Sequence, residues 1–120
     1  MIYIFLVTHF VSDFLFQSRE MGRMKSEDFH FLFLHFIYIF LSFFIVSLFF
    51  TGIEVSFYFS FLYSFLHCLQ DKYIWKLYSL RETYKEYYDD EVFYHTIGFD
   101  QLLHTCILLS LLGMFNITGI

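Results

Sequence analysis

The residues of this chain best suited to chemistry are histidines and aspartates that stand four positions apart within apolar sequence. Residues at positions i and i+4 share one face of a helix and lie about 6 Å apart. Imidazole nitrogens and carboxylate oxygens are favoured ligands of zinc, iron and manganese. The pattern therefore predicts a site for one or two divalent transition-metal ions. The predicted metal ligands are three such pairs and one further histidine: His9 with Asp13, His67 with Asp71, Asp100 with His104, and His35.

The composition indicates what surrounds these polar residues. Hydrophobic residues make up 58% of the 120 residues and charged residues only 16%, whereas an average soluble domain has about 25% charged residues. This hydrophobicity excludes a disordered chain. A net charge of -5 without a basic patch argues against nucleic acid as a partner, and two cysteines are too few for a disulfide scaffold. We therefore expect a single integral membrane domain over residues 1–120.

Four apolar stretches are candidate membrane spans: residues 2–17, 29–50, 53–69 and 97–115. A span needs about 20 apolar residues, so the first and third require local thinning of the bilayer or tilting of their partners. A continuous apolar run in lipid must be helical, because a helix satisfies its own backbone hydrogen bonds. The sequence predicts an all-α integral membrane protein: a four-transmembrane-helix up-down bundle with an interfacial helix or loop between its third and fourth helices, over residues 80–94.

The basic residues predict the orientation of this bundle. All seven fall in the two connections that follow the first and third spans: Arg19, Arg23, Lys25, Lys72, Lys76, Arg81 and Lys85. Because positively charged loops stay in the cytoplasm, we expect a multi-pass protein of the inner (plasma) membrane. Loops 18–29 and 72–95 would be cytoplasmic, and both termini would lie outside.

With a rise of about 1.5 Å per residue, the predicted ligands of all four spans fall in one layer of the cytoplasmic half of the bundle. An ionised aspartate at the centre of a span costs about 2.5 to 3.5 kcal/mol. No Lys or Arg lies inside a predicted span, so a metal cation or protonated histidine must offset the carboxylates. Two alternatives to a metal site stay open: a His–Asp hydrogen-bond network that holds the helices together, and a path for protons or ions.

The same polar positions, with Gln17 in the first span and Gln101 in the fourth, resemble a family of small bacterial and phage integral membrane proteins, domain of unknown function 3307. The resemblance covers nearly the whole chain and implies the same membrane fold, but no activity. The chain resembles more distantly the membrane-embedded metal-dependent hydrolases, which also carry His and Asp on bundled helices.

These observations favour a four-span membrane protein with one or two metal ions near the cytoplasmic face; if it is an enzyme, a metal-dependent hydrolase is the class that such a site suits. A bound metal would activate water and polarise a phosphoryl or carbonyl oxygen. Asp13 or Asp71 could act as the catalytic general base, while Gln17 and Gln101 could orient the metal ligands or a substrate. The depth of the layer suits a membrane lipid or a lipid-linked phosphate.

Two rival functions remain. The chain could be a non-enzymatic membrane effector with a structural metal, binding a host membrane protein through residues 80–94. It could also be a proton or ion conductor that uses the His–Asp layer as a relay, although the outer half of the predicted spans offers only hydroxyl groups and Glu54 to continue such a path. The sequence leaves the metal, the substrate and the oligomeric state open.

Overall fold

The computed structural model describes residues 1–15, 28–79 and 91–117, and these residues contain helices and turns without a strand. Helix α1 (Ile2–Phe10) continues directly into a short π-helix, η1 (Val11–Leu15). The remaining helices are α3 (Phe29–Ser47), α4 (Ile53–Ser79) and α5 (Glu91–Met114). The prediction of an all-helical chain is confirmed over the described residues.

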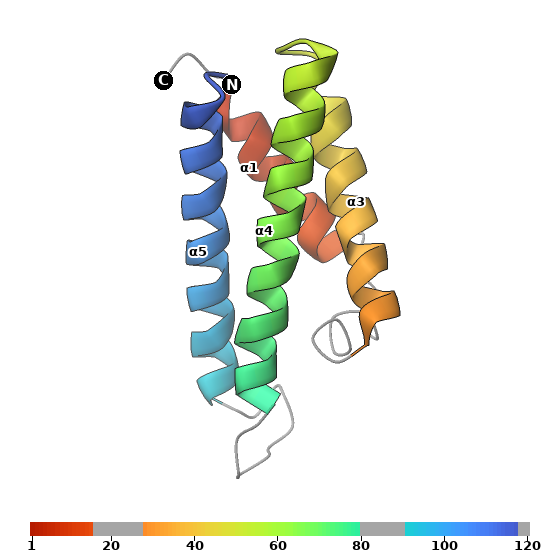
Figure 1. Cartoon of the computed structure of the whole chain (residues 1–120). Helices are drawn as coiled ribbons and strands as arrows, with labels where there is room; N and C mark the ends of the chain where they lie inside the picture. Colours follow the sequence, from red (N-terminus) through yellow and green to blue (C-terminus); the bar gives the residue numbers. More distant parts are fainter. Residues whose placement is uncertain (16–27, 80–90, 118–120) are drawn as a thin grey trace.

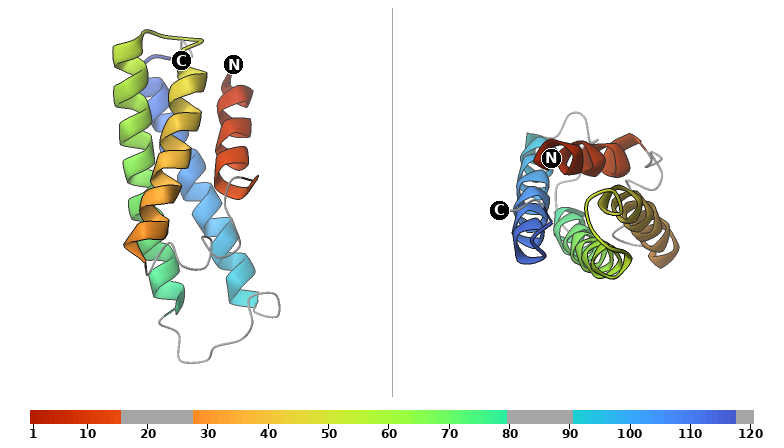
Figure 2. Two further views of the ribbon diagram at one scale, coloured as in Figure 1. Left: turned by 90° about the vertical axis from the view of Figure 1, so that its right-hand side faces the viewer. Right: turned by 90° about the horizontal axis from the view of Figure 1, so that it is seen from above.

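The helices run alternately up and down around a common axis (Figures 1 and 2). Both termini and the turn between α3 and α4 lie at one end, while α4 ends and α5 begins at the opposite end (Figure 1). Helix α4 packs against both α3 and α5, and α1 with η1 packs against α3. Helices α3 and α4 therefore each have two neighbours: α3 lies between α1 and α4, and α4 lies between α3 and α5.

The helices differ from the predicted spans at their ends. Helix α4 continues through Ser79 rather than ending near residue 69, because no glycine or proline interrupts its sequence. Helix α5 begins at Glu91, before the predicted start at residue 97. Of the predicted interfacial segment, residues 91–94 form the first turn of α5, and residues 80–90 lie outside the described part of the chain.

Two helices are long and apolar enough to cross a membrane: Phe29–Ser47 and Tyr94–Met114. Helix α4 has 27 residues, but its last turns carry Lys72 and Lys76. Helices α1 and η1 together measure only about 21 Å, less than the roughly 30 Å of a bilayer core. The geometry therefore gives two candidate spans, and a crossing by all four segments belongs to the proposal below.

The interior of the bundle has an apolar half and a polar half. Near the end with the termini, Phe5, Phe43, Phe59 and Tyr63 are fully buried, and the rings of Phe43 and Tyr63 lie 4.4 Å apart. Leu108, Leu111 and Leu112 of α5 complete this apolar cluster. This apolar cluster fills the bundle between the polar residues and the end with the termini.

The buried polar side chains are as prominent as the apolar ones. They come from every helix: His9, Ser12, Asp13, His35, Ser47, Ser56, Ser60, Ser64, His67, Asp71, Asp100 and His104. Many large apolar side chains face outward instead, among them Tyr3 at 79% exposure and Phe49 at 82%. A buried layer of polar side chains beneath a surface with many exposed apolar side chains is the pattern expected of helices that face lipid.

Candidate metal centre

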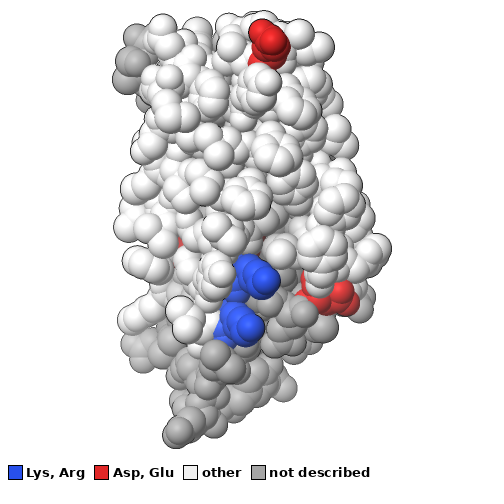
Figure 3. Space-filling view, in the orientation of Figure 1, with Lys and Arg blue, Asp and Glu red and all other residues white. Residues whose placement is uncertain are grey.

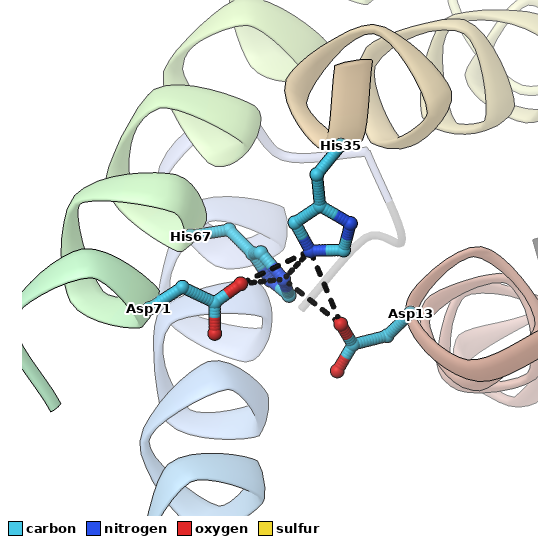
Figure 4. A group of neighbouring side chains, drawn as sticks. All are labelled: Asp13, His35, His67 and Asp71. Carbon is cyan, nitrogen blue, oxygen red and sulfur yellow. Dashed lines mark hydrogen bonds and ion pairs between the residues drawn. The ribbon is translucent and has the colours of Figure 1, made fainter. Parts of the chain in front are cut away.

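Four buried side chains converge near the middle of the bundle (Figure 4). Asp13 comes from η1, His35 from α3, and His67 and Asp71 from α4. The Nε2 atoms of the two histidines lie 3.2 Å apart. His35 Nε2 lies 3.3 Å from Asp13 Oδ1 and 3.0 Å from Asp71 Oδ2, and His67 Nε2 lies 3.3 Å from each of the same two oxygens. We call these four side chains the primary cluster.

The distances within the primary cluster match those of a tetrahedral metal site. Four ligand atoms placed about 2.0 Å from one ion in tetrahedral geometry are about 3.3 Å from one another. The distance between the two nitrogens and the four distances from nitrogen to oxygen range from 3.0 to 3.3 Å, and one ligand atom from each residue lies within 4.8 Å of the others. These distances suit a single ion held by all four side chains.

Local structure explains how each ligand reaches the centre. His67 and Asp71 stand one turn apart on α4, so they share its inward face. Asp13 lies in η1, where π-type hydrogen bonding turns the side chains relative to a regular α-helix. Asp28 caps the start of α3 by accepting a hydrogen bond from the backbone N–H of His30 at 2.9 Å, which fixes the helix that presents His35.

A second group adjoins the first on the side of α5. His104 Nε2 lies 3.0 Å from Asp71 Oδ1 and 3.1 Å from Asp100 Oδ1. The rings of His67 and His104 are stacked, with centroids 3.7 Å apart and planes 13° from parallel. Asp71 thus contacts the primary cluster through one oxygen and His104 through the other. We call Asp100 and His104, with the Oδ1 atom of Asp71, the secondary cluster.

His9 takes part in a hydrogen-bond chain rather than in either cluster. Its Nδ1 atom is 2.7 Å from the hydroxyl of Tyr63, and its Nε2 atom is 2.7 Å from Gln101 Oε1. Gln101 Nε2 in turn donates to Asp13 Oδ2 at 2.8 Å. An amide oxygen only accepts, so His9 must donate from Nε2, and Nδ1 of a neutral His9 must accept from Tyr63. Each hydrogen bond of this series, from Tyr63 to His9, from His9 to Gln101 and from Gln101 to Asp13, is therefore donated in the direction of Asp13.

Tyr63 and Gln70 are site residues that the sequence analysis missed. Tyr63 stands one turn before His67, so its spacing could have placed it on the same face of α4. Gln70 donates from Nε2 to the backbone oxygen of Asp100 at 3.0 Å and so ties α4 to the turn of α5 that carries that aspartate. The spacing of Gln70 gives no comparable signal, because its partner is a backbone atom of another helix.

The structure brings six predicted metal ligands into the two clusters: Asp13, His35, His67, Asp71, Asp100 and His104. The predicted role of His9 as a metal ligand stays a prediction, since its two ring nitrogens contact Tyr63 and Gln101. Gln101 donates a hydrogen bond to Asp13, and its predicted orienting role stays a prediction. Gln17 lies outside the described residues.

Comparison with known proteins gives a family and no activity. No curated protein and no solved structure matches the chain. One family does match, over residues 1–119, and its description is that of a protein of unknown function, DUF3307. Since this match spans almost the whole chain and agrees with the resemblance carried by the polar positions, the chain belongs to the DUF3307 family.

Proposed function

We propose that this chain is a multi-pass membrane protein that binds a divalent transition metal at the primary cluster and uses it to hydrolyse a lipid or lipid-linked substrate at the cytoplasmic face. The observation that carries the proposal is the convergence of four buried ligand side chains, with the distance between the two nitrogens and all four nitrogen-to-oxygen distances at 3.0 to 3.3 Å. Zinc, iron and manganese suit this set of two imidazoles and two carboxylates.

The same distances favour a metal over a plain hydrogen-bond network. An imidazole nitrogen either donates one hydrogen bond or accepts one. His35 Nε2, however, has three neighbours at 3.0 to 3.3 Å: Asp13 Oδ1, Asp71 Oδ2 and His67 Nε2. A single N–H cannot point at all three, whereas one cation at the centre interacts with every member of the cluster.

The distribution of side chains supports a membrane location. Large apolar side chains face outward along the helices, and the face in Figure 3 carries its charged side chains mainly near the two ends. Lys72 and Lys76 are exposed at the end where α4 terminates. Because basic residues favour the cytoplasmic side, we assign that end to the cytoplasm. His35 lies six positions after the first residue of α3, about 9 Å along the helix axis, a depth that a lipid head group could reach.

Because four protein atoms surround it, a bound divalent ion would take a substrate oxygen or a water as a fifth ligand, polarise that oxygen and make the water acidic enough to ionise near neutral pH. The protein's own contribution is to hold the carboxylates in place. Gln101 keeps Asp13 oriented through its amide hydrogen bond, and Asp13 is the candidate general base. Asp71 is the other candidate, but it contacts three histidines, which leaves Asp13 the better placed of the two.

The apolar cluster argues against conduction. A proton or ion path would need polar groups that continue from the site to the end with the termini. In that half of the described bundle, Phe5, Phe43, Phe59 and Leu108 are fully buried, and the polar side chains buried with them are the hydroxyls of Ser47, Ser56 and Ser60, which do not titrate. A membrane effector would bind its host protein through residues 80–94, most of which lie outside the described part of the chain. No observation favours this function.

The experiment uses protein purified in mild detergent. Elemental analysis should find bound transition metal, and mass spectrometry should detect cleavage products from vesicles of mixed zwitterionic and anionic phospholipid. Asp13→Asn should abolish cleavage while leaving the melting temperature close to that of the wild type, because Asn keeps the side-chain volume but is a poor base and a weaker ligand. Glu54→Gln, at an exposed acidic residue, is the matched control and should keep full activity.

Two results would contradict the proposal in different ways. Folded wild-type protein without metal would favour the His–Asp hydrogen-bond network. Metal-loaded protein that cleaves neither these phospholipids nor a lipid-linked phosphate would reject hydrolysis and favour the membrane-effector function.

A further inference from the structure

Three carboxylates are buried at the centre of the bundle, one more than a single ion can neutralise. Asp13, Asp71 and Asp100 are each at most 2% exposed. A divalent ion bound by neutral histidines offsets two of these negative charges. The lysine side chains that the structure describes, Lys72 and Lys76, are both exposed. Another positive charge is therefore needed inside, because an uncompensated buried charge is strongly unfavourable.

The secondary cluster lies where that charge is needed. Its three atoms are Asp71 Oδ1, Asp100 Oδ1 and His104 Nε2, and the nitrogen lies 3.0 and 3.1 Å from the two oxygens. Ligand atoms about 2.0 to 2.1 Å from one ion are about 3.0 to 3.3 Å apart in octahedral or tetrahedral geometry. The two nitrogen-to-oxygen distances of the secondary cluster fall within this interval.

We propose that the secondary cluster binds a second divalent ion and that Asp71 bridges the two ions, one through each carboxylate oxygen. This inference rests on the proposed function, since it adds an ion to the primary cluster. Paired catalytic ions lie about 3.5 to 4 Å apart. The stacked rings of His67 and His104 are 3.7 Å apart, and their Nε2 atoms face different oxygens of the same carboxylate. Two imidazoles stacked at this distance, each beside its own oxygen of one carboxylate, are compatible with two ions at such a separation.

The two ions would have different roles. The primary cluster supplies four protein atoms, so its ion can accept a water or a substrate oxygen only by expanding to five ligands. The secondary cluster supplies three, which leaves a position for water or a substrate oxygen. Asp13 also approaches Asp100 and His104, but its Oδ2 atom accepts a hydrogen bond from Gln101. The second ion would therefore bind an oxyanion of the substrate, such as a phosphoryl or carboxylate group, beside the water-activating ion of the primary cluster.

Gln101 connects the two ions as a positioning residue. Its amide nitrogen lies 2.8 Å from Asp13 Oδ2 and 3.5 Å from Asp100 Oδ2. One amide group thus orients a ligand of the first ion and faces a ligand of the second. Its Oε1 atom accepts a hydrogen bond from His9 Nε2, and His9 Nδ1 in turn accepts one from the hydroxyl of Tyr63.

The test is the number of ions per chain in protein purified in mild detergent and reconstituted with Mn²⁺ alone. Wild type should bind two, and electron paramagnetic resonance should show an exchange-coupled pair. Asp100→Asn and His104→Ala should each bind one ion, with the six-line signal of isolated Mn²⁺. His95→Ala, at an exposed histidine of the same helix, is the matched control and should bind two coupled ions.

The possible results separate the two proposals. No bound ion in folded wild-type protein would overturn the primary site and the second ion together. One ion in wild type, unchanged in His104→Ala, would keep the primary site and overturn the second ion, with protonated His104 as the missing charge. Two ions without exchange coupling would overturn the bridging role of Asp71. Because the wild-type measurements decide these outcomes, the inference stays testable even where a variant fails to fold.

Discussion

At the scale of single residues, the direction of each hydrogen bond around Asp13 follows from the chemistry of one side chain. Gln101 must present its NH₂ group to the carboxylate of Asp13, so its oxygen faces His9. That orientation makes His9 a donor at Nε2 and an acceptor at Nδ1. Tyr63, fully buried, supplies the proton at Nδ1. Because each hydrogen bond of this series can be donated in only one direction, the series holds Asp13 in one orientation.

Gln101→Met should weaken metal binding while keeping the fold. Methionine has nearly the volume of glutamine, but it leaves Asp13 Oδ2 and His9 Nε2 without their amide partner. Loss of a side chain that orients a metal ligand typically lowers metal affinity or activity about 10- to 100-fold, and competition titration with a metal-sensitive dye measures this change.

Gln70→Met is the control for that prediction. Gln70 is also partly buried and also donates through Nε2, but to the backbone oxygen of Asp100. Its replacement should cost about 1 kcal/mol of stability and leave metal affinity within about twofold of wild type. Equal losses of affinity in both variants would contradict the orienting role of Gln101.

At the scale of helices, α4 determines the geometry of the site. It carries Tyr63, His67 and Asp71 at four-residue spacing on its inward face. Serines at positions 56, 60 and 64 line the same buried side of the helix and are fully buried. Cys68, one turn beyond Ser64, contacts the backbone oxygen of Leu32 on α3 at 3.9 Å. Small side chains at such positions let neighbouring helices approach closely, and this close approach brings His35 within reach of His67.

Ser60→Leu should therefore destabilise the bundle. The larger side chain must fit into a space that holds a hydroxymethyl group, and overpacking of this kind costs about 1 to 3 kcal/mol. The thermal melting temperature in detergent should fall, and metal affinity should fall with it if the α3–α4 distance increases. Ser110→Leu, at an exposed serine of α5, should leave both quantities unchanged; a similar loss there would mean that burial is not the cause.

At the scale of the whole molecule, the bundle holds its buried histidines and aspartates at one depth, and large apolar side chains pack the half toward the termini. Polar groups from all four helices meet in one layer, and the cluster that includes Phe5, Phe43 and Phe59 packs the half toward the termini. If the chain spans the membrane as proposed, the site opens toward the side that carries the basic residues.

A cysteine-labelling experiment checks this orientation. In a Cys68→Ser, Cys106→Ser background, Thr51→Cys should react with a membrane-impermeant thiol reagent in intact cells, because the turn between α3 and α4 lies outside. Ser26→Cys should react only after the cells are permeabilised, since its loop is rich in basic residues and stays in the cytoplasm. The reverse pattern would place the site in the outer half of the membrane.

Much of the site follows from the sequence alone. Four-residue spacing decides that His67 and Asp71, or Asp100 and His104, share a helix face, because helix geometry is nearly invariant. The scarcity of charge in the apolar stretches decides that the helices bury their polar faces against one another, since a carboxylate facing lipid is too costly. The all-helical class and the layer of His and Asp were predictable for these two reasons.

Only the tertiary structure decides which atoms meet. The spacing of His9 and Asp13 suggests one shared role, yet His9 contacts Tyr63 and Gln101 while Asp13 joins His35 and His67. The division arises because η1 departs from α-helical geometry just after His9 and because α4 and α5 present different partners to successive turns. The two oxygens of Asp71 likewise serve two clusters only because α3 and α5 pack on either side of α4. Helical periodicity fixes directions within one helix, whereas contacts between helices depend on how the helices pack.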